Sequence, residues 1–252
     1  MNKLLLFLLP FTLSAQFDPN VSGTTGLWQT DAVSKVTLDG VNVDVALDQI
    51  ASQNLTTPAN QPAWGPNYMA FDGSNSEYIF TGDYYDPRAN DFSFDIFFKT
   101  GADVTTLQYL ILKGTSGNYW RVVITTGLLG LRIFAGANWV LISPAIVANT
   151  NYLFSFSGDR DGTQRAYLNG VSVLDQSTTN TVDINNAANF TIATQDNISN
   201  FFTGFVYEAR IVAGVTTDHA AYYADLQCRY LSLGCSADKG LKKFNRFPVY
   251  KK

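Results

Sequence analysis

Short stretches with the residue alternation of a β-strand recur along almost the whole of this 252-residue chain. The clearest is DFSFDIFFKT at residues 91–100. Its apolar residues at positions 92, 94, 96 and 98 are predicted to face a core, and Ser93, Asp95 and Lys99 to face outward. About a dozen such stretches, with turn signals roughly every 8–12 residues, predict an all-β sandwich or barrel.

Pairs of Asn or Asp with Gly mark turns between the predicted strands. Asn169-Gly170 separates AYL from VSV and predicts a two-residue hairpin, because Asn and Gly both accept positive φ. Asp161-Gly162 marks another turn. The chain has no internal repeat and no linker between two domains, so we expect one domain over residues 17–235.

One helix is expected near the end of this domain. Thr217-Asp218 is predicted to cap it and Gly234 to end it. Its apolar side carries Ala221, Leu226, Tyr230 and Leu233. His219, the sole histidine, lies in the first turn and is expected to be exposed or to cap the helix, because a zinc site or a catalytic triad needs further ligands or partners.

Residues 1–16, MNKLLLFLLPFTLSAQ, have the pattern of a secretory signal peptide, with Lys3 before an apolar run and Ser14-Ala15 at the cleavage point. The apolar run is shorter than the about 20 residues that span a bilayer. The alternatives are a buried N-terminal strand or an uncleaved anchor. We expect a protein that is secreted or lies at the cell surface or in the periplasm, or alternatively in a virion.

The charges are unevenly distributed. Residues 17–235 hold 10 Lys and Arg against 20 Asp and Glu, whereas residues 236–252 hold six Lys and Arg against Asp238 alone. The acidic domain argues against nucleic-acid binding, because phosphate contacts need clustered basic side chains. The basic tail, residues 236–252, is expected to be flexible, or else to mediate self-association by docking onto an acidic partner such as a neighbouring copy.

The two cysteines, Cys228 and Cys235, lie close together at the end of the domain. In an exported chain they are expected to form a disulfide, because Gly234 breaks the helix and turns the chain between them. The alternative is two small buried apolar residues.

Three segments in a fixed order carry a family resemblance: FDGSNSEYIF at 71–80, RAYLNGVSV at 165–173 and GFVYEARI at 204–211. With the TTDHAAYYADLQCRYLSLG segment that follows, the chain from Gly26 to Gly234 resembles the laminin-G-like, concanavalin-A-like lectin/glucanase jelly-roll superfamily in its bacterial and phage form. It departs from the family at DQIASQNLTT, where relatives are rich in Ser, Gly and Asn. It also has Tyr207 before Glu208, where an acidic residue is common.

The resemblance implies two antiparallel sheets in a jelly-roll sandwich with a short closing helix. It also implies a binding role, because many members bind carbohydrate, some with Ca²⁺, and others bind proteins. We therefore expect a non-catalytic module for carbohydrate recognition or adhesion, whose partner is a glycan or a surface protein. The alternative is a structural or adhesion protein such as a virion surface or fibre component.

Glycoside hydrolysis is the least favoured interpretation. It needs two carboxylates placed across the scissile bond. The chain has only two glutamates, Glu77 and Glu208, and they lie far apart in sequence. Asp159 and Asp161 share a turn, where water is expected to level their pKa values.

The same pair, Asp159 and Asp161, is the candidate Ca²⁺ site, since Ca²⁺ prefers carboxylate and carbonyl oxygens in loops. The alternative is turn chemistry, in which Asp accepts backbone N–H groups. For sugar binding the candidates are aromatic residues near loops with amides beside them, and the alternative for each aromatic is the core. They are Tyr84, Tyr85, Asn118, Trp120, Asn138 and Trp139.

Overall fold

The computed structural model describes residues 24–30, 34, 36–40, 42–47, 49, 54–57, 61–74, 78–79, 85–114, 117–135, 138–176, 181–194 and 199–233, without the side chains of 24–26, 78–79, 135 and 138–142. The predicted signal peptide (1–16), the basic tail (236–252), Glu77 and Tyr84 lie outside these residues. Within the described part there are 17 strands and one helix.

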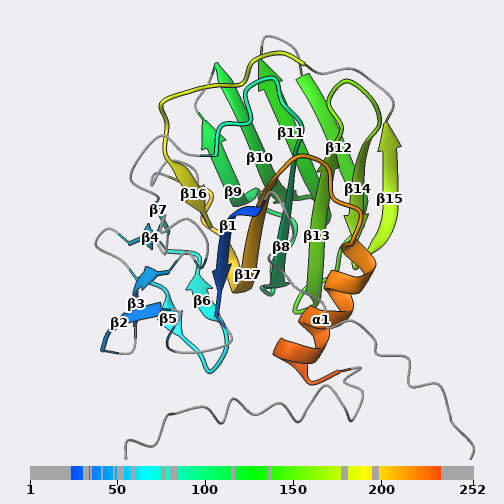
Figure 1. Cartoon of the computed structure of the whole chain (residues 1–252). Coiled ribbons are helices and arrows are strands. Elements are labelled where there is room, and N and C mark those ends of the chain that lie inside the picture. Colours follow the sequence, from blue (N-terminus) through cyan, green and yellow to red (C-terminus); the bar gives the residue numbers. More distant parts are fainter. Residues whose placement is uncertain are drawn as a thin grey trace, which may run out of the picture.

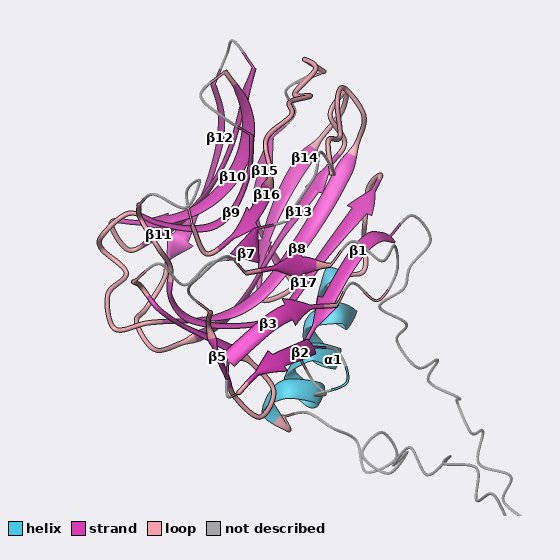
Figure 2. Cartoon of the chain, turned by 90° about the vertical axis from the view of Figure 1, so that its left-hand side faces the viewer, coloured by secondary structure: helices cyan, strands magenta, loops and turns pink. Residues whose placement is uncertain are grey.

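Two antiparallel layers form the molecule (Figures 1 and 2). The first layer has the order β15-β14-β13-β8-β17-β1, with β6 pairing to the start of β17. Its strands are β15 (Val171–Gln176), β14 (Gln164–Leu168), β13 (Asn151–Gly158), β8 (Phe92–Thr100), β17 (Thr203–Ala213), β1 (Thr24–Gln29) and β6 (Met69–Asp72).

The second layer has the order β12-β11-β10-β9-β16-β7-β4. Its strands are β12 (Asn138–Ala145), β11 (Leu128–Ala135), β10 (Asn118–Thr125), β9 (Gln108–Gly114), β16 (Phe190–Ile192), β7 (Tyr78–Ile79) and β4 (Leu55–Thr56). Three short strands join the layers at one edge, namely β2 (Val36–Asp39), β3 (Asn42–Ala46) and β5 (Ala63–Trp64). Strand β3 pairs with β2, β4 and β5, and β5 pairs with β6. The predicted all-β, two-sheet antiparallel sandwich is confirmed.

Aromatic side chains fill the space between the layers. Phe94 of β8 stacks on Trp120 of β10 with ring centroids 5.2 Å apart, and Trp28 of β1 stacks on Phe190 of β16 at 5.5 Å. These rings are fully or almost fully buried. Stacked aromatic pairs contribute about 0.5–1.5 kcal/mol each beyond their area burial, so these contacts help to hold the two sheets together.

The outward-facing side of β8 is not exposed, which corrects the prediction for Ser93 and Asp95. Both are almost completely buried, and Lys99 is half-buried over the Phe205 ring. The reason is that β8 is a central strand, with β13 on one side and β17 on the other, and helix α1 (His219–Leu231) covers its second face. Alternation in sequence thus marks the two faces correctly but does not say whether the second face is covered.

The hairpin at Asn169-Gly170 forms as predicted between β14 and β15. Both residues have positive φ, 56° and 76°, as a type I′ turn requires. The Asn169 side chain also accepts a hydrogen bond from the Leu153 backbone N–H at 2.9 Å. The turn therefore fixes the β14–β15 register and ties it to β13.

Helix α1 buries only part of the face expected: Leu226 and Tyr230 are buried as predicted, and Ala221 and Leu233 are not. Its buried residues are His219, Tyr222, Leu226 and Tyr230. Ala221 and Leu233, predicted to be on the apolar side, are exposed. The helix begins after Asp218, as predicted, but the Asp218 side chain makes no cap hydrogen bond, because Arg210 takes its carboxylate.

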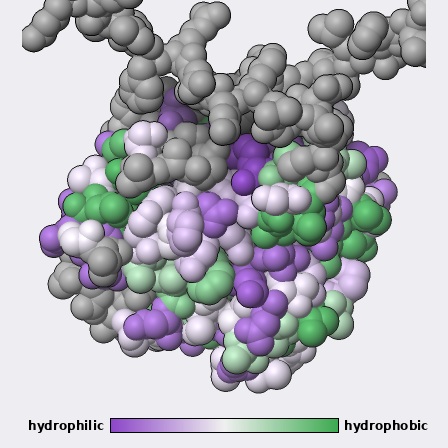
Figure 3. Space-filling model, turned by 90° about the horizontal axis from the view of Figure 1, so that it is seen from below, coloured by the Kyte–Doolittle hydropathy of each residue, from purple (hydrophilic) through white to green (hydrophobic). Residues whose placement is uncertain are grey.

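In the view from below, the apolar residues of the described part form small separate groups among polar ones (Figure 3). Among the described residues no helix combines the length and the hydropathy that a membrane crossing requires.

Candidate binding site

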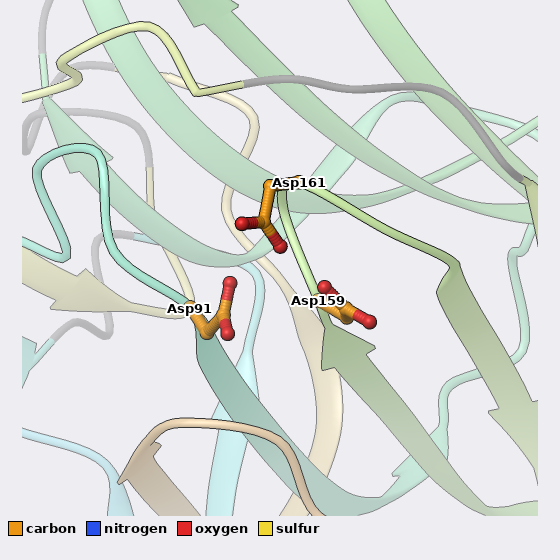
Figure 4. Close-up of side chains that lie close together, drawn as sticks. All are labelled: Asp91, Asp159 and Asp161. Atoms are coloured by element: carbon orange, nitrogen blue, oxygen red, sulfur yellow. The ribbon is translucent and has the colours of Figure 1, made fainter.

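Three carboxylates meet at one end of the first layer. Asp91 directly precedes β8, Asp159 directly follows β13, and Asp161 lies two residues further on (Figure 4). One oxygen of each lies within 4.8 Å of the others. Asp91 and Asp159 are half-buried and Asp161 is exposed.

The strand register creates this cluster. Phe92 pairs with Gly158 at the end of the β8–β13 ladder, so the next residues outward, Asp91 and Asp159, become neighbours. A turn then brings Asp161 back, with the Gly162 N–H donating to the Asp159 carbonyl at 3.2 Å.

Arg160 anchors the turn between the two aspartates. Its backbone N–H donates to Asp91 Oδ1 at 2.8 Å, and its buried guanidinium donates to the carbonyls of Arg88 and of Val182, the latter at 2.7 Å. The loops around residues 88 and 182 are therefore fixed to the carboxylate cluster.

Crowding changes the acid–base behaviour of Asp161, which corrects the expectation that water levels the pKa values in this turn. A hydrogen bond with Asp159, the charge of Asp159 and then the charge of Asp91 raise the pKa of Asp161 above its ordinary value. Like charges this close disfavour full ionisation. A cation bound between them would relieve the same repulsion.

The chemistry of the donor set suits a hard cation. Carboxylate oxygens are the ligands that Ca²⁺ prefers, and a Ca²⁺ ion here would be held by Asp91, Asp159 and Asp161. The sequence indicated two of the three. Asp91 was missed because it lies 68 positions before Asp159, and only the β8–β13 pairing brings the two together.

Trp120 is a core residue, and its prediction as a sugar-binding residue is wrong. It is 0% exposed and packs between Phe92, Phe94 and Phe190. The even-numbered residues of β10, Trp120 to Ile124, face the opposite sheet, so the ring points into the sandwich although it lies near the start of its strand.

Tyr85 also contributes to the core. Its half-buried ring makes edge contacts with Trp28 and Phe190 at 5.3 and 5.4 Å, and its φ is 62°. This packing leaves little of the ring for a sugar.

Asn118 is half-buried at the start of β10 and donates to the Asn185 carbonyl at 3.3 Å. Asn138 pairs with Phe134 and Trp139 with Ile133 in the β11–β12 ladder, but their side chains lie outside the described part. For Tyr84, Asn138 and Trp139 the sugar-binding assignment stays a prediction.

A buried polar network lies between α1 and the first sheet. Arg210 of β17 donates to Asp95 at 2.8 Å and to both oxygens of Asp218 at 3.0 and 3.1 Å. Burial would raise the pKa of Asp95, but the charge of Arg210 and the hydrogen bond with His219 lower it below its ordinary value.

His219 belongs to this network, which corrects the expectation that it is exposed or caps the helix. It is 1% exposed and stacks on Tyr167 with ring centroids 4.0 Å apart. Its Nδ1 lies 3.3 Å from Asp95 Oδ1, and its Nε2 lies 3.1 Å from the Thr216 carbonyl. The imidazole thus connects the start of α1 to β8.

Glu208 of β17 is the centre of a second buried network. Its carboxylate accepts hydrogen bonds from Gln29, Tyr222, Tyr230 and Arg229. Every one of these donors belongs to β1 or α1, so the charge holds the helix and the edge strand to the sheet.

Cys228 lies in α1 and is disulfide-bonded. Its expected partner, Cys235, lies outside the described residues.

Comparison with family models gives no match, and none of the curated proteins matches either. Solved structures do match. The binding domain of Paraclostridial Mosquitocidal Protein 1 superposes with a TM-score of 0.60 at 11% identity, over 81% of this chain and 52% of that one. The ligand binding domain of botulinum neurotoxin serotype D, in complex with N-acetylneuraminic acid, gives 0.55 at 15% identity, over 81% and 51%. What this chain shares with these structures is its fold, a two-sheet antiparallel β sandwich.

A third similar structure is Trypanosoma rangeli sialidase in complex with sialic acid, with a TM-score of 0.58 and 11% identity over 83% of this chain and 33% of that one. This chain spans about half the length of the two toxin binding domains that it matches. The expected resemblance in fold is confirmed over most of the chain.

Proposed function

We propose that this protein is a secreted, non-catalytic binding module that recognises carbohydrate at a cell surface. The observation that carries the proposal is the fold. Over 81% of its length the chain shares a jelly roll with domains whose described role is binding, one of them in complex with a sialic acid.

The buried, fully bonded state of Glu208 also favours binding over hydrolysis. Glu208 is buried, ion-paired with Arg229 and hydrogen-bonded on both oxygens. A general acid must instead reach the glycosidic oxygen with its proton. We therefore assign Glu208 a structural role, and we assign no catalytic residue.

A glycan-array screen of the whole chain, with and without Ca²⁺, tests the proposal. Binding to a defined group of glycans supports it. If no glycan binds but the protein self-associates or co-purifies with particles, the structural or virion alternative replaces it. Release of reducing sugar that an Asp161→Asn change abolishes would instead establish a hydrolase.

A further inference from the structure

The second sheet has a charge distribution unlike the rest of the domain. Residues 104–158 contain no Asp or Glu, although residues 17–235 hold 20 of them. The same segment carries Lys113, Arg121 and Arg132. Lys113 is fully buried and ion-paired with Asp86.

Arg121 and Arg132 lie on the face of the second sheet that points away from the core. In β10 and β11 the core-facing residues are Trp120, Val122, Ile124, Leu129, Leu131 and Ile133. The residues between them face the other way and include both arginines, which are half-buried. Helix α1 packs against the other sheet (Figure 2).

The two arginines are combined with aromatic rings into one patch. Tyr119 and Phe134 are direct cross-strand partners and stack with centroids 5.4 Å apart at 17°. The Arg121 guanidinium lies 4.9 Å from the Tyr119 ring centroid, and that of Arg132 lies 5.8 Å from it and 5.9 Å from Phe134. We call Tyr119, Arg121, Arg132 and Phe134 the arginine–aromatic patch.

This arrangement is unfavourable for a purely structural role. Arg121 and Arg132 are direct partners in the β10–β11 ladder, and like charges placed opposite each other destabilise a sheet. Among the described residues no carboxylate lies within ion-pair distance of Arg121, and its buried Nε has no hydrogen-bond partner there. An anion placed between the two guanidiniums would lower the repulsion between them.

We propose that the arginine–aromatic patch binds an acidic sugar, with Arg121 and Arg132 holding its carboxylate or sulfate and Tyr119 and Phe134 contacting its ring. The proposal rests on the proposed function and names its ligand class. Guanidinium groups match the geometry of such oxyanions with paired hydrogen bonds. Aromatic rings beside them supply the apolar surface that a pyranose ring covers, which an isolated inorganic anion does not need.

The floor under the arginines is apolar, formed by Leu112 and Val123 together with Tyr109, whose hydroxyl accepts a hydrogen bond from Arg121. A charged rim over an apolar floor holds an anion more strongly than a fully hydrated surface does.

The experiment measures binding of the whole chain to four probes, namely a sulfated oligosaccharide, a sialylated oligosaccharide, a neutral oligosaccharide and polyglutamate. The variants are Arg132→Gln, which removes one charge, and Arg121→Lys, which keeps the charge but removes the planar fork. The matched control is Arg165→Gln on β14, whose exposed ion pair with Asp175 lies on the other sheet. Melting curves confirm that each variant is folded.

We expect the wild type to bind one or both acidic sugars and to bind the neutral sugar and polyglutamate at least tenfold more weakly. Arg132→Gln and Arg121→Lys should each weaken acidic-sugar binding by about 10-fold or more, because each loses charge-assisted hydrogen bonds, and Arg165→Gln should not. The sulfated and sialylated arms identify which oxyanion is bound.

The results that would overturn the proposal differ in whether they also overturn the proposed function. If a neutral sugar binds as tightly as the acidic ones, or if folded arginine variants bind like the wild type, the patch is not the site and the proposed function stands. If polyglutamate binds as tightly as the sugars, the patch recognises acidic peptide instead. If no oligosaccharide binds to the wild type, the proposed function fails together with the patch.

Discussion

At the scale of single residues, Arg210 connects the central strand β8 to the start of helix α1. It lies between Asp95 of the central strand and Asp218 at the start of α1, all but fully buried from water on the Asp95 side. Removing one partner of a buried pair leaves the other charge uncompensated.

Asp95→Asn should therefore lower the free energy of unfolding by about 3–5 kcal/mol. Asp175→Asn, which removes an exposed ion pair with Arg165, should lower it by less than about 1 kcal/mol. Urea denaturation of the two variants at neutral pH measures both values. Equal small losses would show that the buried network does not hold the fold.

Asp95 also makes the stability of the fold depend on pH. Because folding lowers the pKa of Asp95 below its ordinary value of 3.8, ionised Asp95 favours the folded state above that pH, and this contribution is lost as the pH falls through the folded-state pKa. The stability of the wild type should thus approach that of Asp95→Asn in strong acid. Urea denaturation at a series of pH values from neutral into strong acid measures the difference. A constant difference would contradict the assignment.

At the scale of elements, α1 is attached to the sheet by its buried face. Leu226 is completely buried there, whereas Leu233, two residues beyond the helix, is 53% exposed. Leu226→Ala should lower the free energy of unfolding by about 2–5 kcal/mol, and Leu233→Ala should leave it within about 0.5 kcal/mol. Thermal unfolding followed by far-ultraviolet circular dichroism compares them, and a larger effect at Leu233 would contradict the observed helix face.

Two substitutions at Asn169 in the β14–β15 hairpin separate the effect of its positive φ from the effect of its side-chain hydrogen bond. Asn169→Gly keeps the positive φ but loses the bond to Leu153, for a loss of about 0.5–1.5 kcal/mol. Asn169→Ala loses the bond and strains the backbone as well, so it should lose about 1–3 kcal/mol more. Denaturant unfolding of the two variants gives their order, and Ala being milder than Gly would contradict the turn geometry.

Features set by neighbouring residues could be predicted from the sequence, whereas features set by contacts between distant segments could not. The hairpin was predictable because Asn169-Gly170 acts locally. The buried state of Ser93, Asp95 and His219 was not, because it depends on α1 packing over β8 from more than 100 residues away. Trp120 was misassigned because its position at a strand start says nothing of which face meets the other sheet. Asp91 could not be assigned to the carboxylate cluster from the sequence, because only the β8–β13 register brings it beside Asp159.

At the scale of the whole molecule, the carboxylate cluster lies where two strands and two loops meet, so a bound cation would stabilise the entire end of the sandwich. If Ca²⁺ binds there, 100-fold excess over its dissociation constant should add about 2.7 kcal/mol of stability. The Asp91→Asn and Asp159→Asn variants should lose this gain, whereas Asp103→Asn, an exposed aspartate bound by Thr105 and Thr106, should keep it.

Differential scanning fluorimetry with Ca²⁺, with Mg²⁺ and with a chelator measures that effect. The gain should also shrink in acid, because the raised pKa of Asp161 lets protons compete with the cation. No shift in the melting temperature of the wild type with Ca²⁺ would show that the three carboxylates serve the turn alone.

The proposed binding of carbohydrate without chemical change is tested most directly by calorimetric titration of the whole chain with a glycan selected on the array, followed by mass spectrometry of the recovered glycan. We expect saturable heat and a glycan of unchanged mass. A glycan recovered in cleaved form, or the absence of binding heat with every glycan tested, would contradict it.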